Sequence, residues 1–463
     1  MKSLTYFLIT LIIIAPFMAN GVPFGAPTAF ADFDCLTLSP GATPDQRQYC
    51  QDQITQLEAQ LQVLNNQLTS QKAQSGTLQG DVNLLTKQIA AKKLEIKAKQ
   101  LKVSQLTESI GEKQTTIESL DQKIQREQDS IAQLLRKTDE MDRTTLTTFL
   151  LSSQSLSDFY SDVSRFDTLK TQVKASVDNI QTIKGVTQQK KAELVKEQNQ
   201  TIDEKQSLQS VQAGLAQNQA TQKQLLSISK GQEAQYQKVI AAQQAKVAQI
   251  KAKLFQLAGG GQAIRFDVAL QYAQTAADKT GIDPAFLLAI ATQESNLGSN
   301  VGTCYLTNTS TGAGISIKSG NTFPNVMKPS RDVPPFLDIT SRLGYDPMKT
   351  VVSCPIAGAG GYGGAMGPAQ FIASTWKLFE SRLKAALGYD ANPWAPQDAF
   401  VASAMYLTDL GASGTSYSSQ LRAACKYYGS GGSTCTYGRS VMGLKASIQS
   451  DIDYLKQYGI SRR

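Results

Sequence analysis

The chain has 463 residues, which is enough for two or three domains, and it contains no histidine. The absence of histidine excludes Ser-His-Asp and Cys-His catalysis and the histidine ligands of most catalytic zinc sites, so any catalysis must use carboxylates, hydroxyls, Lys or Tyr. The net charge of +8 fits binding to an anionic polymer such as cell wall, nucleic acid or a lipid surface, and does not choose among them.

Residues 1–31 have the order of a secretory signal. Lys2 precedes an almost wholly apolar run from Leu4 to Met18, and small residues follow as far as Ala29-Phe30-Ala31. This order predicts cleavage before Asp32, and the apolar run is short for a retained membrane anchor. The protein is therefore expected to be exported, to the periplasm, the cell wall or the medium.

The six cysteines agree with export, because an even number of cysteines in an exported chain suggests disulfides. None has the C-x-x-C spacing of a zinc site, and neither a metal nor a cofactor is expected. Sequence alone does not decide the pairing, although we favour bridges between neighbours. These candidate pairs are Cys35–Cys50, Cys304–Cys354 and Cys425–Cys435.

After a short N-terminal segment, residues 32–50, apolar residues recur every seven positions. The interleaved positions include leucines, so the pattern predicts a coiled-coil seam. About 85 residues in one helix would form a rod on the order of 130 Å long. The first set is Ile54, Leu61, Leu68, Ser75, Val82, Ile89, Ile96, Val103, Ile110, Ile117, Ile124 and Ile131.

The pattern breaks at residues 143–169, and a weaker heptad-like stretch runs from Val173 to Leu257. The simplest arrangement for residues 51–258 is an antiparallel coiled-coil hairpin with a helical tip at 143–169. A parallel dimer between two chains is the alternative.

This region resembles the coiled-coil regulatory domains of bacterial peptidoglycan hydrolases that act in cell separation. The resemblance rests on the long hairpin and on LLSSQSLSDFYSDVSRFDTLK, residues 150–170. It implies that the membrane complex FtsEX binds the tip and relieves autoinhibition. A passive spacer is the other interpretation. The usual catalytic domains of these hydrolases need histidine, so this chain requires another kind of enzyme.

Gly259-Gly260-Gly261 predicts a flexible joint, and residues 259–463 are expected to form a compact, mainly α-helical domain. Asp283 and Pro284 predict a helix start, as do Ser374 and Pro396. Residues 298–364 are rich in Gly, Pro, Ser and Thr and predict a long binding loop or lid.

Glu294 lies on the apolar face of the helix that Asp283 begins. Leu287 and Ile290 precede it by seven and four residues, so all three share one side. A desolvated carboxyl has a raised pKa, which favours the protonated form that a general acid needs. The other interpretation is a solvent-facing glutamate at a frayed helix end.

Four sequence blocks in this domain resemble lytic murein transglycosylases, which have a lysozyme-like, mainly α fold and cut the MurNAc–GlcNAc bond of peptidoglycan. They occur in the family's order. The blocks are ESNLG (294–298), GYGGAMGPAQFIASTW (361–376), NPWAPQDAFVASAMYL (392–407) and AACKYYGSGG (423–432).

The resemblance implies a role for each matched residue. Glu294 matches the catalytic acid, and the other matches are expected to orient it or to contact the glycan. Trp376 and Trp394 are expected in the core rather than on a sugar. The matched substrate-binding residues are Ser295, Gly364, Met366, Gly367, Gln370 and either Tyr427 or Tyr428.

Glycosidases usually pair two carboxylates, and no second acid has a convincing pattern here. One glutamate suffices if the MurNAc 6-hydroxyl is the nucleophile and a 1,6-anhydro ring forms. A lysozyme-like hydrolase and a non-catalytic wall-binding division scaffold are the alternatives. A nucleic-acid partner is not expected, because the positive charge forms no basic run. The candidates for a second acid are Asp332, Asp338, Asp346 and Asp398.

Overall fold

The computed structural model describes most of the chain after residue 32. The predicted signal, the Gly259–Gly261 joint and residues 143–155 of the predicted tip lie outside the described residues. The described ranges are 33–72, 77–142, 156–228, 232–255, 263–298, 303–355, 361–430, 432 and 434–459.

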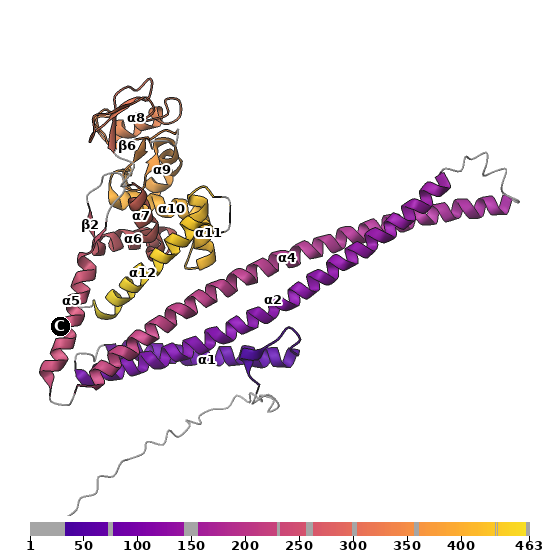
Figure 1. Cartoon of the computed structure of the whole chain (residues 1–463), viewed down its shortest axis with the longest axis horizontal. Coiled ribbons are helices and arrows are strands. Elements are labelled where there is room, and N and C mark those ends of the chain that lie inside the picture. The colour runs from indigo at the N-terminus through magenta and orange to yellow at the C-terminus, as the bar shows by residue number, and fades with distance from the viewer. Residues whose placement is uncertain are drawn as a thin grey trace, which may run out of the picture.

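The protein is mainly α-helical, which confirms the predicted fold class at that level (Figure 1). Short strands and a 3₁₀ turn complete it. The N-terminal elements are η2 (Cys35–Thr37), α1 (Pro44–Lys72), α2 (Leu78–Asp142), α4 (Leu156–Leu226) and α5 (Glu233–Ala252). The later helices are α6 (Phe266–Thr280), α7 (Pro284–Gly298), α8 (Val333–Arg342), α9 (Ala373–Leu387), α10 (Pro396–Asp409), α11 (Tyr417–Tyr427) and α12 (Thr436–Tyr458). The strands are β1 (Leu254–Phe255), β2 (Ile264–Arg265), β3 (Thr303–Leu306), β4 (Gly314–Ser316), β5 (Thr322–Phe323), β6 (Val352–Ser353), β7 (Ala365–Met366) and β8 (Phe371–Ile372).

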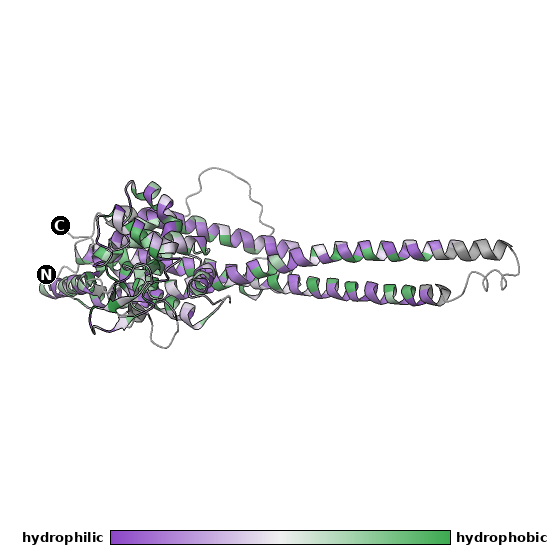
Figure 2. Cartoon of the chain, turned by 90° about the horizontal axis from the view of Figure 1, so that it is seen from above, coloured by the Kyte–Doolittle hydropathy of each residue, from purple (hydrophilic) through white to green (hydrophobic). Residues whose placement is uncertain are grey.

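Helices α2 and α4 pack along each other in opposite directions (Figure 1). Polar contacts between them show the direction, because residue numbers rise along α2 while those of the partners fall along α4. Hydrophobic residues recur among hydrophilic ones along the long helices (Figure 2). Such spacing is typical of helices that pack through one apolar face. The contacts are Gln88–Asn218 (3.2 Å), Lys99–Glu204 (3.2 Å), Lys113–Glu197 (2.8 Å) and Asp121–Lys191 (3.2 Å).

The prediction of one continuous rod from residue 51 is wrong, because α1 ends at Lys72 and packs against α2 in the opposite direction. Gln105 donates a hydrogen bond to Gln51, and Arg47 forms an ion pair with Glu108 at 2.9 Å. A heptad pattern is the same whether a helix continues or turns back on itself, so the repeat did not reveal the reversal. The reversal falls between Lys72 and Leu78.

The C-terminal helices surround one large core, and α7 lies inside it with Phe286, Leu287 and Leu288 almost fully buried. Helix α7 packs mainly on α12, and α6 packs on α10. Asp283 accepts a hydrogen bond from the Ala285 amide and so caps α7 as expected.

Residues 298–364 do not form the long irregular loop that their composition predicted. This segment contributes β3 to β6 and helix α8, and its strands join β7 and β8 in an antiparallel sheet of order β5-β4-β3-β6-β7-β8. The strands are two to four residues long, too short to give a recognisable alternation of apolar and polar residues.

The long helices contact the C-terminal domain at the start of α11. Both carboxylate oxygens of Asp203, on α4, are used: one accepts from the Ser416 hydroxyl at 2.7 Å and the other from the Ser418 amide at 2.8 Å. A second contact joins Gln457 of α12 to Asn218 at 3.2 Å.

Three disulfides join neighbouring cysteines, Cys35–Cys50, Cys304–Cys354 and Cys425–Cys435, as we favoured from the sequence. Disulfides are typical of an oxidising compartment. In the part of the chain that the structure describes, no helix combines the length and apolar character needed to span a bilayer.

Candidate functional site

Glu294 lies in the last part of α7, where the helix leaves the core. Its side chain is partly buried, whereas Leu287 and Ile290 on the same side are almost completely buried. The neighbouring Gln293 accepts a hydrogen bond from the Ser440 hydroxyl of α12 at 2.9 Å, which ties this end of α7 to the last helix. The carboxyl therefore sits at the edge of the core rather than at a free helix end.

The hydroxyl of Tyr437 donates a hydrogen bond to Glu294 Oε1 at 2.5 Å. Tyr437 is buried in the first turn of α12. The pKa of Tyr437 lies far above its ordinary range, mainly because of burial and also because of the charge on Glu294. The phenol therefore keeps its proton, which it donates in the hydrogen bond to the Glu294 carboxylate.

Burial raises the pKa of Glu294, and the hydrogen bond from Tyr437 opposes part of that rise by stabilising the carboxylate. The net direction is upward. A carboxyl with a raised pKa holds its proton at higher pH than an exposed glutamate, as a general acid requires.

Tyr437 lies between two other tyrosine rings. Tyr428 stacks on it at 4.7 Å between centroids and is 61% exposed, while Tyr427 lies near-parallel at 6.5 Å. Tyr427 in turn contacts Tyr406 of α10 at 5.5 Å. The stack therefore continues from solvent into the core directly beside Glu294.

The Cys425–Cys435 disulfide joins the end of α11 to the start of α12 and so holds these tyrosines together. Gly438 is required at this junction, because a Cβ there would lie 2.7 Å from Cys425 Sγ and 3.1 Å from the Leu421 carbonyl oxygen. The close approach brings Tyr437 to the carboxyl.

A small cavity of about 10 Å³ adjoins Glu294 and is mostly apolar. It has room for about one water molecule, and Ser403 and Tyr427 bring hydroxyl-bearing side chains to its lining. Its walls come from all four sequence blocks. They are Leu287, Ile290, Ala291 and Glu294 of α7, Pro368 and Ala369 of the second block, Ala399, Phe400 and Ser403 of α10, and Tyr427 of α11.

The structure separates the two tyrosine candidates. Tyr427 lines the cavity with Glu294, and burial together with the charge on Glu294 raises its pKa well above the ordinary range. Tyr428 instead covers the outer face of Tyr437. The backbone of Ser295 belongs to α7, but its side chain lies outside the described residues.

Gln370 and the glycines of the second block have contacts that differ from the sequence expectation. The Gln370 side chain donates to the Gly367 carbonyl at 2.7 Å rather than to Glu294, and its backbone has a φ of 53°. A Cβ on Gly367 would lie 2.0 Å from the Pro393 carbonyl oxygen, so protein rather than sugar occupies that space. Gly364 faces Val326 and Met327 in the same way, and Met366 is fully buried.

The four candidate second acids are engaged elsewhere. Asp332 accepts from Ser374 and pairs with Arg331, and Asp338 pairs with Lys377 and Arg342. Asp346 accepts from the Met348 amide, and Asp398 accepts from Tyr389 and the Asn392 amide. Within the described residues, no group of three or more acids or cysteines is arranged to hold a metal ion.

Sequence reasoning missed Tyr437 and Ser403. Neither residue occupies a motif position to which the resemblance assigns a role. A tyrosine in the first turn of a helix is common and gives no sign of function. The available signal was indirect: a Cys425–Cys435 bridge must place the residues that follow Cys435 beside Tyr427 and Tyr428.

Comparisons of the chain with protein-family models, curated proteins and solved structures find no significant match.

Proposed function

We propose that this protein is an exported peptidoglycan lytic transglycosylase with Glu294 as its catalytic residue. The observation that carries the proposal is a partly buried glutamate with a raised pKa, next to a mostly apolar cavity and hydrogen-bonded to a phenol that stays protonated. The four sequence blocks that resemble this family all contribute to that cavity. The resemblance supports a lysozyme-like description of the domain.

In the proposed reaction, protonated Glu294 gives its proton to the glycosidic oxygen as the bond from that oxygen to C1 of MurNAc breaks. The MurNAc 6-hydroxyl then forms a bond to C1, and its proton passes to the Glu294 carboxylate. The products are a 1,6-anhydroMurNAc end and a free GlcNAc 4-hydroxyl, and the protein returns to its starting protonation state. One carboxyl serves as acid and then as base, so the reaction needs no second acid.

Tyr437 has a defined part in this scheme. Its hydrogen bond orients the carboxyl and stabilises the charged form that exists between the two proton transfers. The cavity beside Glu294 has room for about one water molecule, so few waters compete with the 6-hydroxyl for attack on C1.

We further propose that the long helices regulate the domain. Asp203 connects α4 to the N-terminal end of α11, and the other end of α11 carries Tyr427. In this proposal the helix pair is a coiled coil, and a membrane complex such as FtsEX recognises it.

Mass spectrometry of the soluble fragments released from purified peptidoglycan tests the function. The chain is expected to release anhydro-muropeptides, and Glu294→Gln is expected to lower the rate by at least about a hundredfold because it removes the titrating proton. Ser440→Ala is the matched control, since it changes the contact to Gln293 and leaves the carboxyl. Reducing ends would identify a hydrolase, and binding without release would identify a wall-binding scaffold.

A further inference from the structure

We propose that Tyr345, Tyr389 and Trp394 form a second carbohydrate-binding surface that takes a β-1,4-linked N-acetylhexosamine chain. We call these three residues the aromatic platform. The identity of the glycan rests on the proposed function, whereas the surface rests on contacts independent of Glu294.

The platform combines exposure with order. Tyr345 is 40% exposed and Tyr389 is 48% exposed, so both residues keep side-chain surface open to solvent. Trp394 is partly buried, and its indole nitrogen donates to the Val351 carbonyl at 2.9 Å. The Tyr345 ring meets Trp394 edge-on at 5.6 Å.

One turn of the chain holds both tyrosines. The Asn392 side chain donates to the Tyr345 hydroxyl at 2.8 Å. The Asn392 amide donates to one oxygen of Asp398, and the Tyr389 hydroxyl donates to the other at 2.7 Å. This last bond raises the pKa of Tyr389 to about 12, so the phenol stays neutral. Rings held in this way lose little conformational entropy when a ligand stacks on them.

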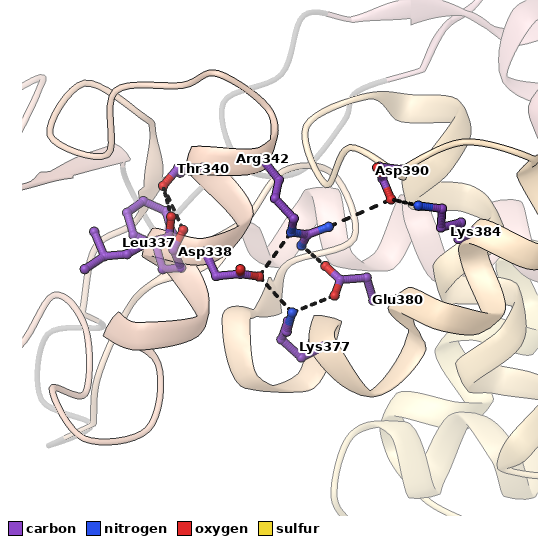
Figure 3. Close-up of polar contacts among 9 residues, drawn as sticks. Leu337, Asp338, Thr340, Arg342, Lys377, Glu380, Lys384 and Asp390 are labelled. Atoms are coloured by element: carbon purple, nitrogen blue, oxygen red, sulfur yellow. Dashed lines mark hydrogen bonds and ion pairs between the residues drawn. The ribbon is translucent and has the colours of Figure 1, made fainter.

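The charges beside the platform favour a sugar over a polyanion. Arg342 pairs with Asp338, Glu380 and Asp390, and Lys384 pairs with the same Asp390 at 2.9 Å (Figure 3). A nucleic acid needs cations that can be given to phosphates, and here the cations are already paired. Exposed aromatic faces edged by hydroxyl and amide groups suit the apolar C–H faces and the hydroxyls of pyranose rings.

The platform is also linked to the Glu294 site through the backbone. The backbone of Pro393 and Trp394 lies directly against Gly367, and the residue after Gly367, Pro368, lines the cavity at Glu294. A glycan strand held on the platform would therefore be presented close to the same loop. We infer that the platform anchors the strand and that Glu294 cuts it.

Calorimetric titration of the full chain with chitohexaose tests the platform, with Glu294→Gln as the background so that no cleavage occurs. Tyr345→Leu and Tyr389→Leu remove a stacking ring and are each expected to weaken binding roughly three- to tenfold. Tyr345→Phe keeps the ring and loses only the bond to Asn392, so its Kd is expected to stay within about twofold of the parent. Tryptophan fluorescence should also change on titration, and loss of that change in Trp394→Phe, which keeps Trp376, assigns it to occupancy of the platform.

Unchanged binding in both leucine variants, or equal weakening by Tyr345→Phe and Tyr345→Leu, would overturn the platform. Circular dichroism of each variant shows whether it is folded. A chain that cleaves peptidoglycan while the leucine variants bind normally disproves the platform alone. A chain that binds chitohexaose through the platform and cleaves nothing supports the platform and disproves the proposed function.

Discussion

The long helix pair and the C-terminal domain reach stability in different ways. Along α2 and α4 the buried isoleucines Ile117 and Ile183 keep 8% and 6% of their surface exposed, and polar Thr187 and Thr201 are buried on the same helices. In the domain, Phe286 and Trp376 are completely buried. The helix pair is thus held by many weak contacts that repeat along its length, whereas the domain is held by fully buried core packing. A catalytic group must be held in one position, and the buried packing of the domain holds Glu294 in this way.

Replacing one buried isoleucine by alanine in each region should show this difference in the free energy of unfolding. It is the largest effect that we predict. Ile339→Ala in α8, where the side chain is 1% exposed, is expected to cost about 3–5 kcal/mol. Ile183→Ala in α4 is expected to cost about 2 kcal/mol, because its surroundings are more open and relax more easily.

Denaturation followed by two signals separates the regions. Both tryptophans, Trp376 and Trp394, lie in the C-terminal domain, so fluorescence reports that domain, while circular dichroism also reports the long helices. If Ile183→Ala moved the fluorescence transition as far as Ile339→Ala, the two regions would unfold as one unit and the comparison would fail.

The same contrast explains what the sequence could predict. The capped start of α7 depends on the neighbouring residues Asp283 and Pro284, and the long helices depend on a repeated pattern. Both kinds of pattern can be recognised in the sequence. The reversal between α1 and α2 was not, because a heptad pattern carries no direction. Tyr437 and Asp203 act through partners more than 140 residues away in the chain, and no local pattern marks such contacts.

The hydrogen bond at the site gives the next prediction. Tyr437→Phe removes the donor that stabilises the Glu294 carboxylate, so the pKa of Glu294 should rise further. The protonated acid then persists to higher pH, and the alkaline limb of the cleavage rate should move upward. The maximal rate should fall roughly tenfold or more, because the carboxylate formed during the reaction loses its partner.

Tyr428→Phe is the control, since Tyr428 stacks on the same ring, whereas the hydrogen bond to Glu294 comes from Tyr437. Its pH–rate profile should match that of the unmodified chain. An unshifted profile for Tyr437→Phe, in a variant that melts normally, would mean that this tyrosine serves packing alone.

The contact between the two regions is expected to have a smaller effect on activity. If the helix pair restrains α11, Asp203→Ala should raise the rate of glycan cleavage, and a fragment of residues 259–463 should be more active than the full chain. We expect about a two- to fivefold increase for Asp203→Ala, since two hydrogen bonds to a charged group contribute on the order of 1–3 kcal/mol and other contacts remain. Asp178→Ala, elsewhere on α4, should change nothing. Equal specific activity of the fragment and the full chain would disprove the restraint.

The smallest predicted effect is on the pH dependence of folding stability caused by Glu294. Because the pKa of Glu294 is raised in the folded state, the folded chain holds this proton to a higher pH than the unfolded chain. Stability therefore declines as pH rises from the ordinary glutamate range through the raised pKa. Gln cannot ionise, so Glu294→Gln should match the parent in acid and melt slightly higher at neutral pH. Thermal melts at several pH values measure this difference. Asp338→Asn removes a carboxyl whose pKa is lowered by its contacts with Lys377 and Arg342, and should show the opposite trend. A constant difference between Glu294→Gln and its parent at every pH would mean that the carboxyl is as well solvated as an exposed one. Its burial beside the cavity would then give it no advantage as an acid.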